Sequence, residues 1–518
     1  MALARPRVGV IALALVPLGF LTLFFAWPVV SIIGLGVRAQ MLETLASADT
    51  WSLVGFTIGQ AAASTMVALL AGMPLAFLLA RVKLPGRGLV QAIVLVPFVL
   101  PTVVVGLAFR TLMPDGGVLS IILANAFFNV AVVARTVGGL WANTDRRAED
   151  AARALGATRF KAFTAVVLPA LTPAIGSAAA VVFLFCSTSF GVVLILGGSE
   201  YRTLETEIYL RTVQLFDLPG AAALSIIQLA AVVAALAVGA VARKRRQAAL
   251  KLRGRQETAR RPVGGEWVVV GIAYGVIALL LTPIISLIGN SSLEGFRALA
   301  STGHDNSLEV TGFRAAMNSL STATDATVLA LILGVLSSVA LMRLGRTAEL
   351  VDVAMMLPLG VSAVTVGFGY LITLDALPGD LRTSPLLVPL AQAIVVTPLI
   401  IRILLPVLRS IDNRLRQAAG TLGASPLRVW LEVDVPLAGR SLVTAAAFGY
   451  VVALGEFGAT SFLARPDAPT LPIAIGRLIS RPGELNNEMA YAACTLLMVV
   501  TIAVAILIER FRTTVEEF

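Results

Sequence analysis

The stretches DAARALGATRFKAFTAVVLP (residues 150–169) and QAAGTLGASPLRVWLEVDVP (residues 417–436) repeat one pattern at a separation of 267 residues. In each, an Ala-Ala pair precedes a Gly by four residues, and a Pro follows that Gly after 13 residues. Apolar residues recur between these markers at steps of three and four, which is typical of helices. The pattern predicts a short helix, a turn at Gly, and a second short helix ending at Pro169 or Pro436. We call these stretches the first and second duplicated segments.

The remainder of the chain is strongly apolar. Hydrophobic residues make up 58% of the sequence and charged residues 14%, and the mean hydropathy is +0.90. Because a helix needs about 20 apolar residues to cross a bilayer, these values predict an all-α integral membrane protein with about 12 transmembrane helices. The expected spans are residues 8–36, 53–80, 89–112, 118–141, 172–197, 221–242, 267–289, 317–342, 349–374, 385–408, 440–463 and 489–508.

Internal repetition extends beyond the duplicated segments. The separation of 267 also relates Asn125 to Gln392, Arg135 to Arg402, Phe190-Gly191 to Phe457-Gly458 and Thr203-Leu204 to Thr470-Leu471. Six spans per half is an even number, so both halves enter the membrane from the same side and form two parallel six-helix repeats. The sequence therefore divides into a first half at 1–242, a basic linker at 243–266 and a second half at 267–518.

Basic residues predict the orientation. Lys and Arg are enriched in cytoplasmic loops, and they cluster before the first span, between spans two and three, and in the linker. Both termini and both duplicated segments are then cytoplasmic. Topology and contact with anionic lipid account for the net charge of +10, so nucleic-acid binding is not expected. The first span is long and carries Pro17 and Pro28, which favours an uncleaved helix over a signal peptide. The two cysteines, Cys186 and Cys494, indicate neither a disulfide framework nor a zinc site.

The duplicated segments resemble the EAA motif of the permeases of ATP-binding-cassette importers. The first copy places Asp where the motif has Glu, and the second places Gln there, whereas the Ala pair and the Gly are retained in both. The resemblance covers nearly the whole chain and implies a type I importer permease whose two halves are fused. Within that family, residues 189–209 and 454–475 resemble the thiamine permeases and the related ferric-iron permeases, with thiamine slightly favoured.

This resemblance implies the partners and the coupling residues. In that family the motif forms coupling helices that dock on two cytoplasmic ATPase subunits, and an extracytoplasmic binding protein delivers the solute across the bacterial plasma membrane. The ATPase-coupling residues implied here are Asp150, Ala151, Ala152, Gly156, Leu168, Pro169, Gln417, Ala418, Ala419, Gly423, Val435 and Pro436. Acidic residues of the external loops, which face the binding protein, are expected to be solvated: Glu200, Glu205, Glu207, Asp467 and Glu484.

The candidate substrate pathway lies where the two halves differ in charge. Glu456 falls within predicted span eleven, and its counterpart is Ser189. A carboxylate inside a membrane is expensive and hence a functional candidate. It could line a cavity for a cation such as thiamine or Fe³⁺, or it could be hydrogen-bonded at a helix break. The possible pathway residues are Ser189, Phe190, Glu456 and Phe457.

Other ionisable residues are weaker candidates. Arg135 and Arg402 lie near the cytoplasmic loop, where they can snorkel, so we expect structural roles. Asp325 is expected to face the bundle. His304, the only histidine, is expected to be exposed, because one His beside an Asp makes a poor metal site.

Alternative functions follow from the same features. The sequence has no Gly-Lys dipeptide, so it lacks a phosphate-binding loop and is not expected to hydrolyse ATP or bind a cofactor itself. A twelve-span repeat also fits an ion-coupled secondary transporter, but that class leaves the duplicated segments unexplained. A membrane-embedded enzyme is less favoured still, because no nucleophile or acid/base cluster is evident.

Overall fold

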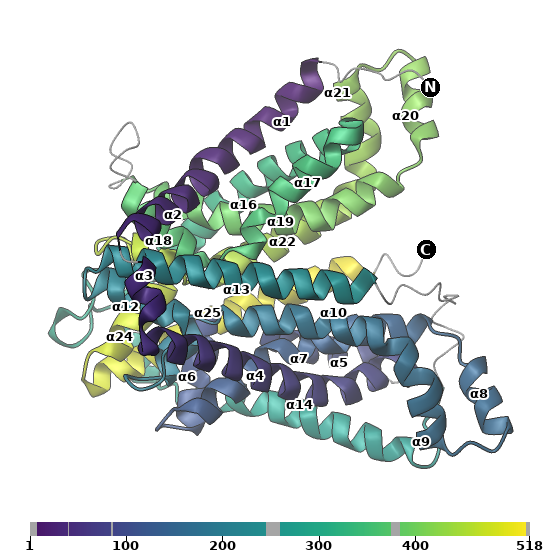
Figure 1. Ribbon diagram of the computed structural model, residues 1–518, viewed down its shortest axis with the longest axis horizontal. Helices are drawn as coiled ribbons and strands as arrows, with labels where there is room; N and C mark the ends of the chain where they lie inside the picture. Colours follow the sequence, from purple (N-terminus) through teal and green to yellow (C-terminus); the bar gives the residue numbers. More distant parts are fainter. Residues whose placement is uncertain (1–7, 40, 84–85, 245–259, 374–383, 514–518) are drawn as a thin grey trace. The chain divides into compact units, whose positions relative to one another are not determined.

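A computed structural model describes residues 8–39, 41–83, 86–244, 260–373 and 384–513. Over these ranges the protein consists of helices, and no strand is present apart from an isolated bridge between Val82 and Arg260 (Figure 1). This confirms the all-α class.

Ten helices of the described ranges are long and apolar enough to cross a membrane. Two further apolar pairs are sharply bent: Arg87–Val99 with Thr102–Leu112 by 98°, and Ala348–Gly360 with Ala363–Thr373 by 94°. If each pair counts as one span, the total is the predicted 12. Pro101 stands at the first bend, where its missing N–H cannot continue the helix.

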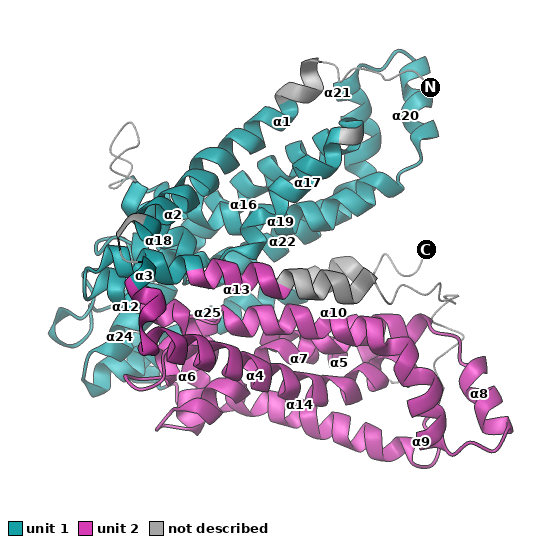
Figure 2. Cartoon of the chain, in the orientation of Figure 1, with its two compact units in different colours: residues 1–42, 208–226, 292–518 teal, residues 43–207, 227–291 magenta. Residues whose placement is uncertain are grey.

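The contacts divide the chain into two compact units, coloured separately in Figure 2. Unit 2 holds residues 43–207 and 227–291. Its core is the packing of α4, α7 and α10, where buried alanines such as Ala61, Ala76 and Ala178 let the helix backbones approach closely. The helices that lie in this unit or begin it are α3 (Met41–Ala46), α4 (Ala48–Arg81), α5 (Arg87–Val99), α6 (Thr102–Leu112), α7 (Val118–Asn143), α8 (Arg147–Ala154), α9 (Arg159–Ala162), the π-helical η2 (Phe163–Val167), α10 (Leu168–Ser187), α11 (Gly191–Leu196) and α14 (Glu266–Gly289).

Unit 1 holds residues 1–42, 208–226 and 292–518. Its core is formed by α16, α19 and α22, with Ala326, Ala393 and Ala445 fully buried. Its helices are α1 (Val8–Leu21), the π-helical η1 (Thr22–Ala26), α2 (Trp27–Ala39), α15 (Leu293–Ala298), the 3₁₀ turn η4 (His304–Asn306), α16 (Gly312–Arg343), η5 (Gly345–Thr347), α17 (Ala348–Met356), η6 (Leu357–Gly360), α18 (Ala363–Thr373), α19 (Leu387–Ser410), α20 (Asn413–Thr421), α21 (Pro426–Val429), the π-helical η9 (Trp430–Asp434), α22 (Val435–Gly455), α23 (Thr460–Leu463), α24 (Leu471–Ser480) and α25 (Glu484–Thr513). Like α3, the helices α12 (Leu204–Val213) and α13 (Leu218–Lys244) contribute residues to both units.

The repeat seen in the sequence is also present element by element. The core triplet α4, α7 and α10 corresponds to α16, α19 and α22, and each half has one bent pair. The π-helical turns η2 and η9 lie 267 residues apart, as do α12 and α24. The first span of each half departs from this scheme, because α14 lies in unit 2 and α1 with α2 lies in unit 1.

Spans five and eleven differ from their predicted limits. The predicted ranges 172–197 and 440–463 correspond to continuous helices Arg159–Ser187 and Pro426–Gly455. Each helix begins inside the duplicated segment and ends before the residue predicted to lie within the membrane span, Ser189 or Glu456.

Candidate functional site

The first duplicated segment contains two short helices joined by a left-handed glycine. Gly156, at φ +90°, follows the end of α8 and donates its N–H to the Arg153 carbonyl at 3.0 Å. The next N–H, of Ala157, donates to the Ala152 carbonyl at 3.1 Å. Glycine takes this backbone conformation without the steric cost of a Cβ. The side chain of Thr158 then caps the start of α9.

The second duplicated segment has the same turn. Gly423, at φ +83°, donates its N–H to the Gly420 carbonyl at 3.0 Å, and Ala424 donates to the Ala419 carbonyl at 3.1 Å. Ser425 takes the place of Thr158 and caps α21. The helix–turn–helix predicted from the sequence is therefore present in both copies, with the same hydrogen bonds.

Each turn presents apolar side chains to solvent. Leu155 is 90% exposed and its counterpart Leu422 is 88% exposed. The next helix of each copy exposes Phe160 by 77% and Leu427 by 67%. Leucines this exposed, at the same place in two copies, form a candidate contact surface. The motif-based prediction omitted these four residues, although their spacing in the sequence marks them.

The predicted coupling residues share one pattern of exposure in the two copies. The half-buried members are Ala152, Leu168, Ala419 and Val435. The exposed members are Asp150, Ala151, Gly156, Pro169, Gln417, Ala418, Gly423 and Pro436.

Neither Pro169 nor Pro436 ends the second helix, which corrects the expectation from the sequence. Each stands at the second position of a span, α10 or α22, that continues directly from a π-helical turn. The π turn shifts the backbone hydrogen-bonding register there, and a proline without an N–H is tolerated where the α-helical bonds begin again. The duplicated segments are consequently joined to α10 and α22 without a flexible loop.

At the far ends of α10 and α22 the helices break at repeat-related positions. Glu456 follows α22, and its carboxylate accepts the N–H groups of Ala459 at 2.7 Å and Thr460 at 3.0 Å, together with the Thr460 hydroxyl. It therefore caps α23 as an N-cap side chain does. In the first half Ser189 donates its hydroxyl to Asn125 Oδ1 at 2.7 Å. The Glu456 carboxylate is thus hydrogen-bonded at a helix break, which is one of the two alternatives that the sequence left open for this residue.

The four residues of the predicted pathway lie at these breaks, two in each unit, and all are buried. Their exposed fractions are 7% for Ser189, 5% for Phe190, 8% for Glu456 and 6% for Phe457.

Buried amides support both breaks, a feature that the sequence reasoning missed. Gln60 Nε2 donates to the Cys186 carbonyl at 2.7 Å near the end of α10. Gln392 Nε2 donates to the Ala453 carbonyl at 3.1 Å, which is the repeat equivalent of Cys186. Asn125, which aligns with Gln392, donates instead to Gln60 Oε1 at 3.1 Å. The sequence contained a signal for this feature, because Asn125 and Gln392 are polar residues at repeat-related positions of apolar spans.

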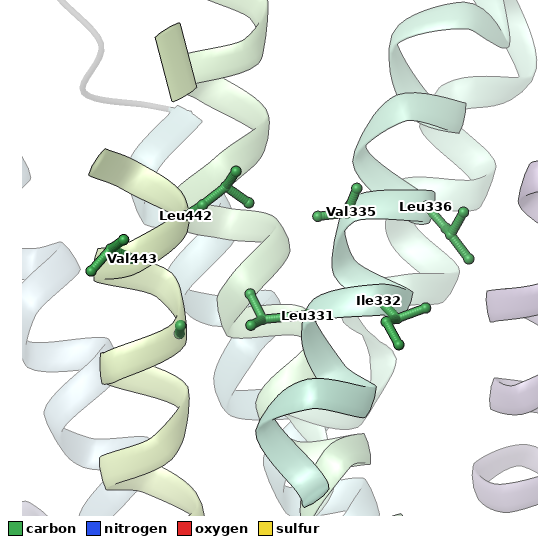
Figure 3. Close-up of a pocket in the computed structure, with 7 residues that line it drawn as sticks. Leu331, Ile332, Val335, Leu336, Leu442 and Val443 are labelled. Carbon is green, nitrogen blue, oxygen red and sulfur yellow. The ribbon is translucent and has the colours of Figure 1, made fainter. Parts of the chain in front are cut away.

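One groove of about 500 Å³ lies between α16 and α22 within unit 1 (Figure 3). Its aliphatic lining offers no side-chain donor, acceptor or charge, so it cannot orient a polar solute. The lining residues are Leu331, Ile332, Val335, Leu336, Leu442, Val443 and Ala446.

Comparison with known proteins shows which family the chain belongs to. Residues 72–247 match the family of the binding-protein-dependent transport system inner membrane component. The sulfate transport system permease protein CysT of Salmonella typhimurium is 33% identical over 227 residues, which cover 38% of this chain and 81% of that protein. The chain belongs to this permease family.

Relatives named as thiamine permeases match the permease over both halves. The thiamine transport system permease protein ThiP of Brucella abortus is 26% identical over 509 residues, covering 90% of this chain and 89% of that protein. The protein of the same name from Escherichia coli is 26% identical over 487 residues, covering 87% and 88%. The permease is therefore a fused, two-half importer subunit that resembles the thiamine permeases.

The remaining ionisable residues of the permease give mixed outcomes. Arg135 and Arg402 are exposed, and Arg402 Nε lies 3.1 Å from the Met356 sulfur. His304 is exposed, as predicted, with Nδ1 3.1 Å from the Asp305 carboxylate. Among the described residues no group of three or more His, Cys, Asp or Glu could hold a metal. Asp325 does not face the bundle but is exposed, because it shares a face of α16 with exposed residues such as Val328.

Two of the external acidic residues are not solvated. Glu205 is fully buried and Glu207 is 7% exposed, because the predicted loop forms α12. Glu205 accepts a hydrogen bond from the Gln228 amide, and Glu207 pairs with Arg202 at 3.3 Å. Asp467 is exposed, and a hydrogen bond from Arg465 holds the pKa of its carboxyl below the usual range.

Proposed function

We propose that the permease imports thiamine. Separate ATPase subunits, which dock at the two duplicated segments, hydrolyse the ATP that drives this import. The observation that carries this proposal is the matched exposure of Leu155 and Leu422 on turns of the same geometry. A segment lying in lipid headgroups has no reason to keep one geometry twice. Two equal docking surfaces fit two copies of one ATPase subunit.

Transport then proceeds by alternating access. Closure of the ATPase subunits on ATP displaces the duplicated segments, and the displacement passes through η2 and η9 into α10 and α22. The two membrane conformations differ in affinity for the ATP-bound ATPase pair, so ATP shifts their populations. An extracytoplasmic binding protein supplies the solute.

Thiamine is favoured among solutes because the thiamine permeases match this chain over both halves. The sulfate permease matches 38% of it. Ferric iron is the second candidate from the sequence resemblance. Ser189, Phe190, Glu456 and Phe457 form the proposed pathway, in which opening of the α22–α23 break would expose the Glu456 carboxylate to a cation.

The proposed arrangement in the inner membrane follows the coupling role. The duplicated segments and both termini face the cytoplasm, with the binding protein on the opposite side. The proposed repeat consists of halves at 1–242 and 267–518, joined by a basic linker at 243–266. The two compact units differ from these halves because they are defined by packing.

Uptake into proteoliposomes tests the proposal. Vesicles would contain the full chain with its ATPase, and its binding protein would be added on the accessible side with labelled thiamine, ferric iron or sulfate. We expect ATP-dependent accumulation of thiamine. Leu155→Glu combined with Leu422→Glu should abolish it, because a carboxylate replaces the apolar contact in each docking surface.

The matched control is Ala148→Glu, which adds the same charge at an exposed position in the first turn of α8. The helix dipole favours an acid there, so uptake should persist. Uptake that follows a proton or sodium gradient without the ATPase would instead support the secondary-transporter alternative. Accumulation of iron or sulfate would keep the importer class and change the solute.

A further inference from the structure

Arg416, which directly precedes the second duplicated segment in α20, links α20 to the membrane helices. Arg416 of α20 donates from Nε to Asp434 Oδ1 at 2.8 Å and from Nη2 to the Leu408 carbonyl at 2.9 Å. Nη1 donates to Asn413 Oδ1 at 2.7 Å and to the Ile411 carbonyl at 3.3 Å. The guanidinium thereby joins α20 to the end of α19 and to the residue that precedes α22.

These contacts use groups that would otherwise be unsatisfied. Leu408 lies in the last turn of α19, where helix carbonyls lack intrahelical partners. Asp434 ends the π-helical turn η9 directly before α22, and its side chain is 2% exposed. A carboxylate this deeply buried requires a paired cation, and the Arg416 side chain, at 21% exposure, supplies one.

A nearby pair shows what an ordinary surface contact looks like. Arg428 and Glu432, within the second duplicated segment, lie 2.8 Å apart, but their side chains are 69% and 56% exposed. Exposed pairs of this kind contribute little to stability, whereas removing one partner of a buried pair is strongly unfavourable. Of these two pairs, therefore, only Arg416–Asp434 can fix the position of a helix.

The first duplicated segment cannot form the same clamp. The repeat equivalents of Arg416 and Asp434 are Glu149 and Val167. The region before that segment contacts a different helix instead. Arg146, just before α8, lies 3.6 Å from Glu266 at the start of α14. Arg159 of α9 donates to the carbonyl of Val263, in the linker that leads into α14.

We propose that Arg416 is a positioning residue that makes α20 and α22 move as one body when the ATPase displaces the second duplicated segment. The first segment is tied instead to Glu266, at the start of α14. The first ATPase stroke therefore reaches α14 in addition to α10, whereas the second acts on α19 and α22, although the two docking turns match. This inference rests on the proposed importer function.

The test measures solute uptake and ATP hydrolysis in the same proteoliposomes, using the full chain with its ATPase and binding protein. Asp434→Asn keeps the side-chain shape but removes the charge that holds Arg416. We expect ATP hydrolysis to stay within about twofold of the unmodified protein while uptake per ATP falls about tenfold, since a buried charge loses its partner. The control Glu432→Gln makes the equivalent change in the exposed pair and should leave the ratio unchanged.

A second variant covers the case in which Asp434→Asn fails to fold. Arg416→Lys keeps the charge but loses the planar fork that reaches several acceptors, so the ratio should fall by an intermediate amount. A folded variant, Asp434→Asn or Arg416→Lys, with the unmodified ratio overturns the inference and leaves the importer function standing. Absence of ATP-dependent uptake with the unmodified chain overturns the proposed function and this inference with it.

Discussion

Gly423 and Gly420 differ in backbone conformation within a few residues of one helix. Gly423 has φ +83° after the end of α20, whereas Gly420 is helical, and a Cβ would meet nothing within 4 Å at either position. Alanine at 423 would have to adopt the left-handed conformation, which costs about 1–2 kcal/mol. Alanine at 420 should stabilise the helix by about 1 kcal/mol. We therefore predict opposite effects from Gly423→Ala and Gly420→Ala.

Hydrogen exchange at the Ala424 amide measures this difference, because that amide donates to the Ala419 carbonyl across the turn. A cost of 1–2 kcal/mol corresponds to roughly 5- to 30-fold faster exchange for Gly423→Ala if the turn opens locally. Equal exchange in the two variants would show that the left-handed conformation is not required. The same argument applies to Gly156 in the first copy.

For single residues, the sequence predicted the location of turns better than the burial and contacts of side chains. The turn at the Gly of each duplicated segment was predicted correctly, because a glycine between helical stretches signals a turn. Glu456 was placed inside a span because hydropathy averages over a window and does not detect a break of a few residues. The buried roles of Glu205 and Glu207 depend on contacts with Arg202 and Gln228, and such contacts follow from packing.

The ends of α10 and α22 are held by amides with unequal numbers of hydrogen bonds. Gln60 donates to the Cys186 and Thr57 carbonyls and accepts from Asn125. Gln392 donates to the Ala453 carbonyl, and its own buried Oε1 has no hydrogen-bond partner among the described residues. Gln60→Leu should therefore destabilise the protein by about 2–3 kcal/mol, because buried partners are left unsatisfied, and Gln392→Leu by about 1 kcal/mol or less.

Thermal unfolding of the purified protein in detergent provides the comparison, with both variants made in the same background. The predicted order of melting temperatures is unmodified protein, then Gln392→Leu, then Gln60→Leu. A lower melting temperature for Gln392→Leu than for Gln60→Leu would contradict the role assigned to the Asn125–Gln60 contact.

Element boundaries were predictable where hydropathy alone sets them. The ranges expected for α7, α14 and α19 agree with the structure to within a few residues. The sequence marks breaks in these two spans through the Pro and Gly residues of 97–106 and 357–367. The angles of 98° and 94° could not be predicted, because Pro and Gly are also tolerated in straight transmembrane helices. The π-helical turns leave no composition signal, so the continuity of the duplicated segments with α10 and α22 could not be read from the sequence.

On the scale of the whole molecule, the sequence repeat and the packing divide the chain differently. The first spans α1 and α2 pack in unit 1 against α16, α17 and α18, which belong to the second half of the sequence. In unit 2, α14 packs against α4, α5 and α6 of the first half. The repeat was visible in the sequence because residues match at a fixed separation. The exchange of first spans was not, because periodicity carries no information on partners.

Splitting the chain in the linker tests whether the exchanged spans hold the halves together. We predict that residues 1–250 and 251–518, coexpressed, copurify, whereas each half alone yields little stable protein because its first span lacks its packing partner. Gly369 of α18 is the sensitive point, since a Cβ there would lie 2.7 Å from Pro28 of α2. Gly369→Leu should reduce copurification. Gly275→Leu in α14, where a Cβ meets nothing within 4 Å, should not. Stable, well-behaved single halves would instead mean that each repeat folds by itself, and the exchange of first spans would then contribute little to assembly.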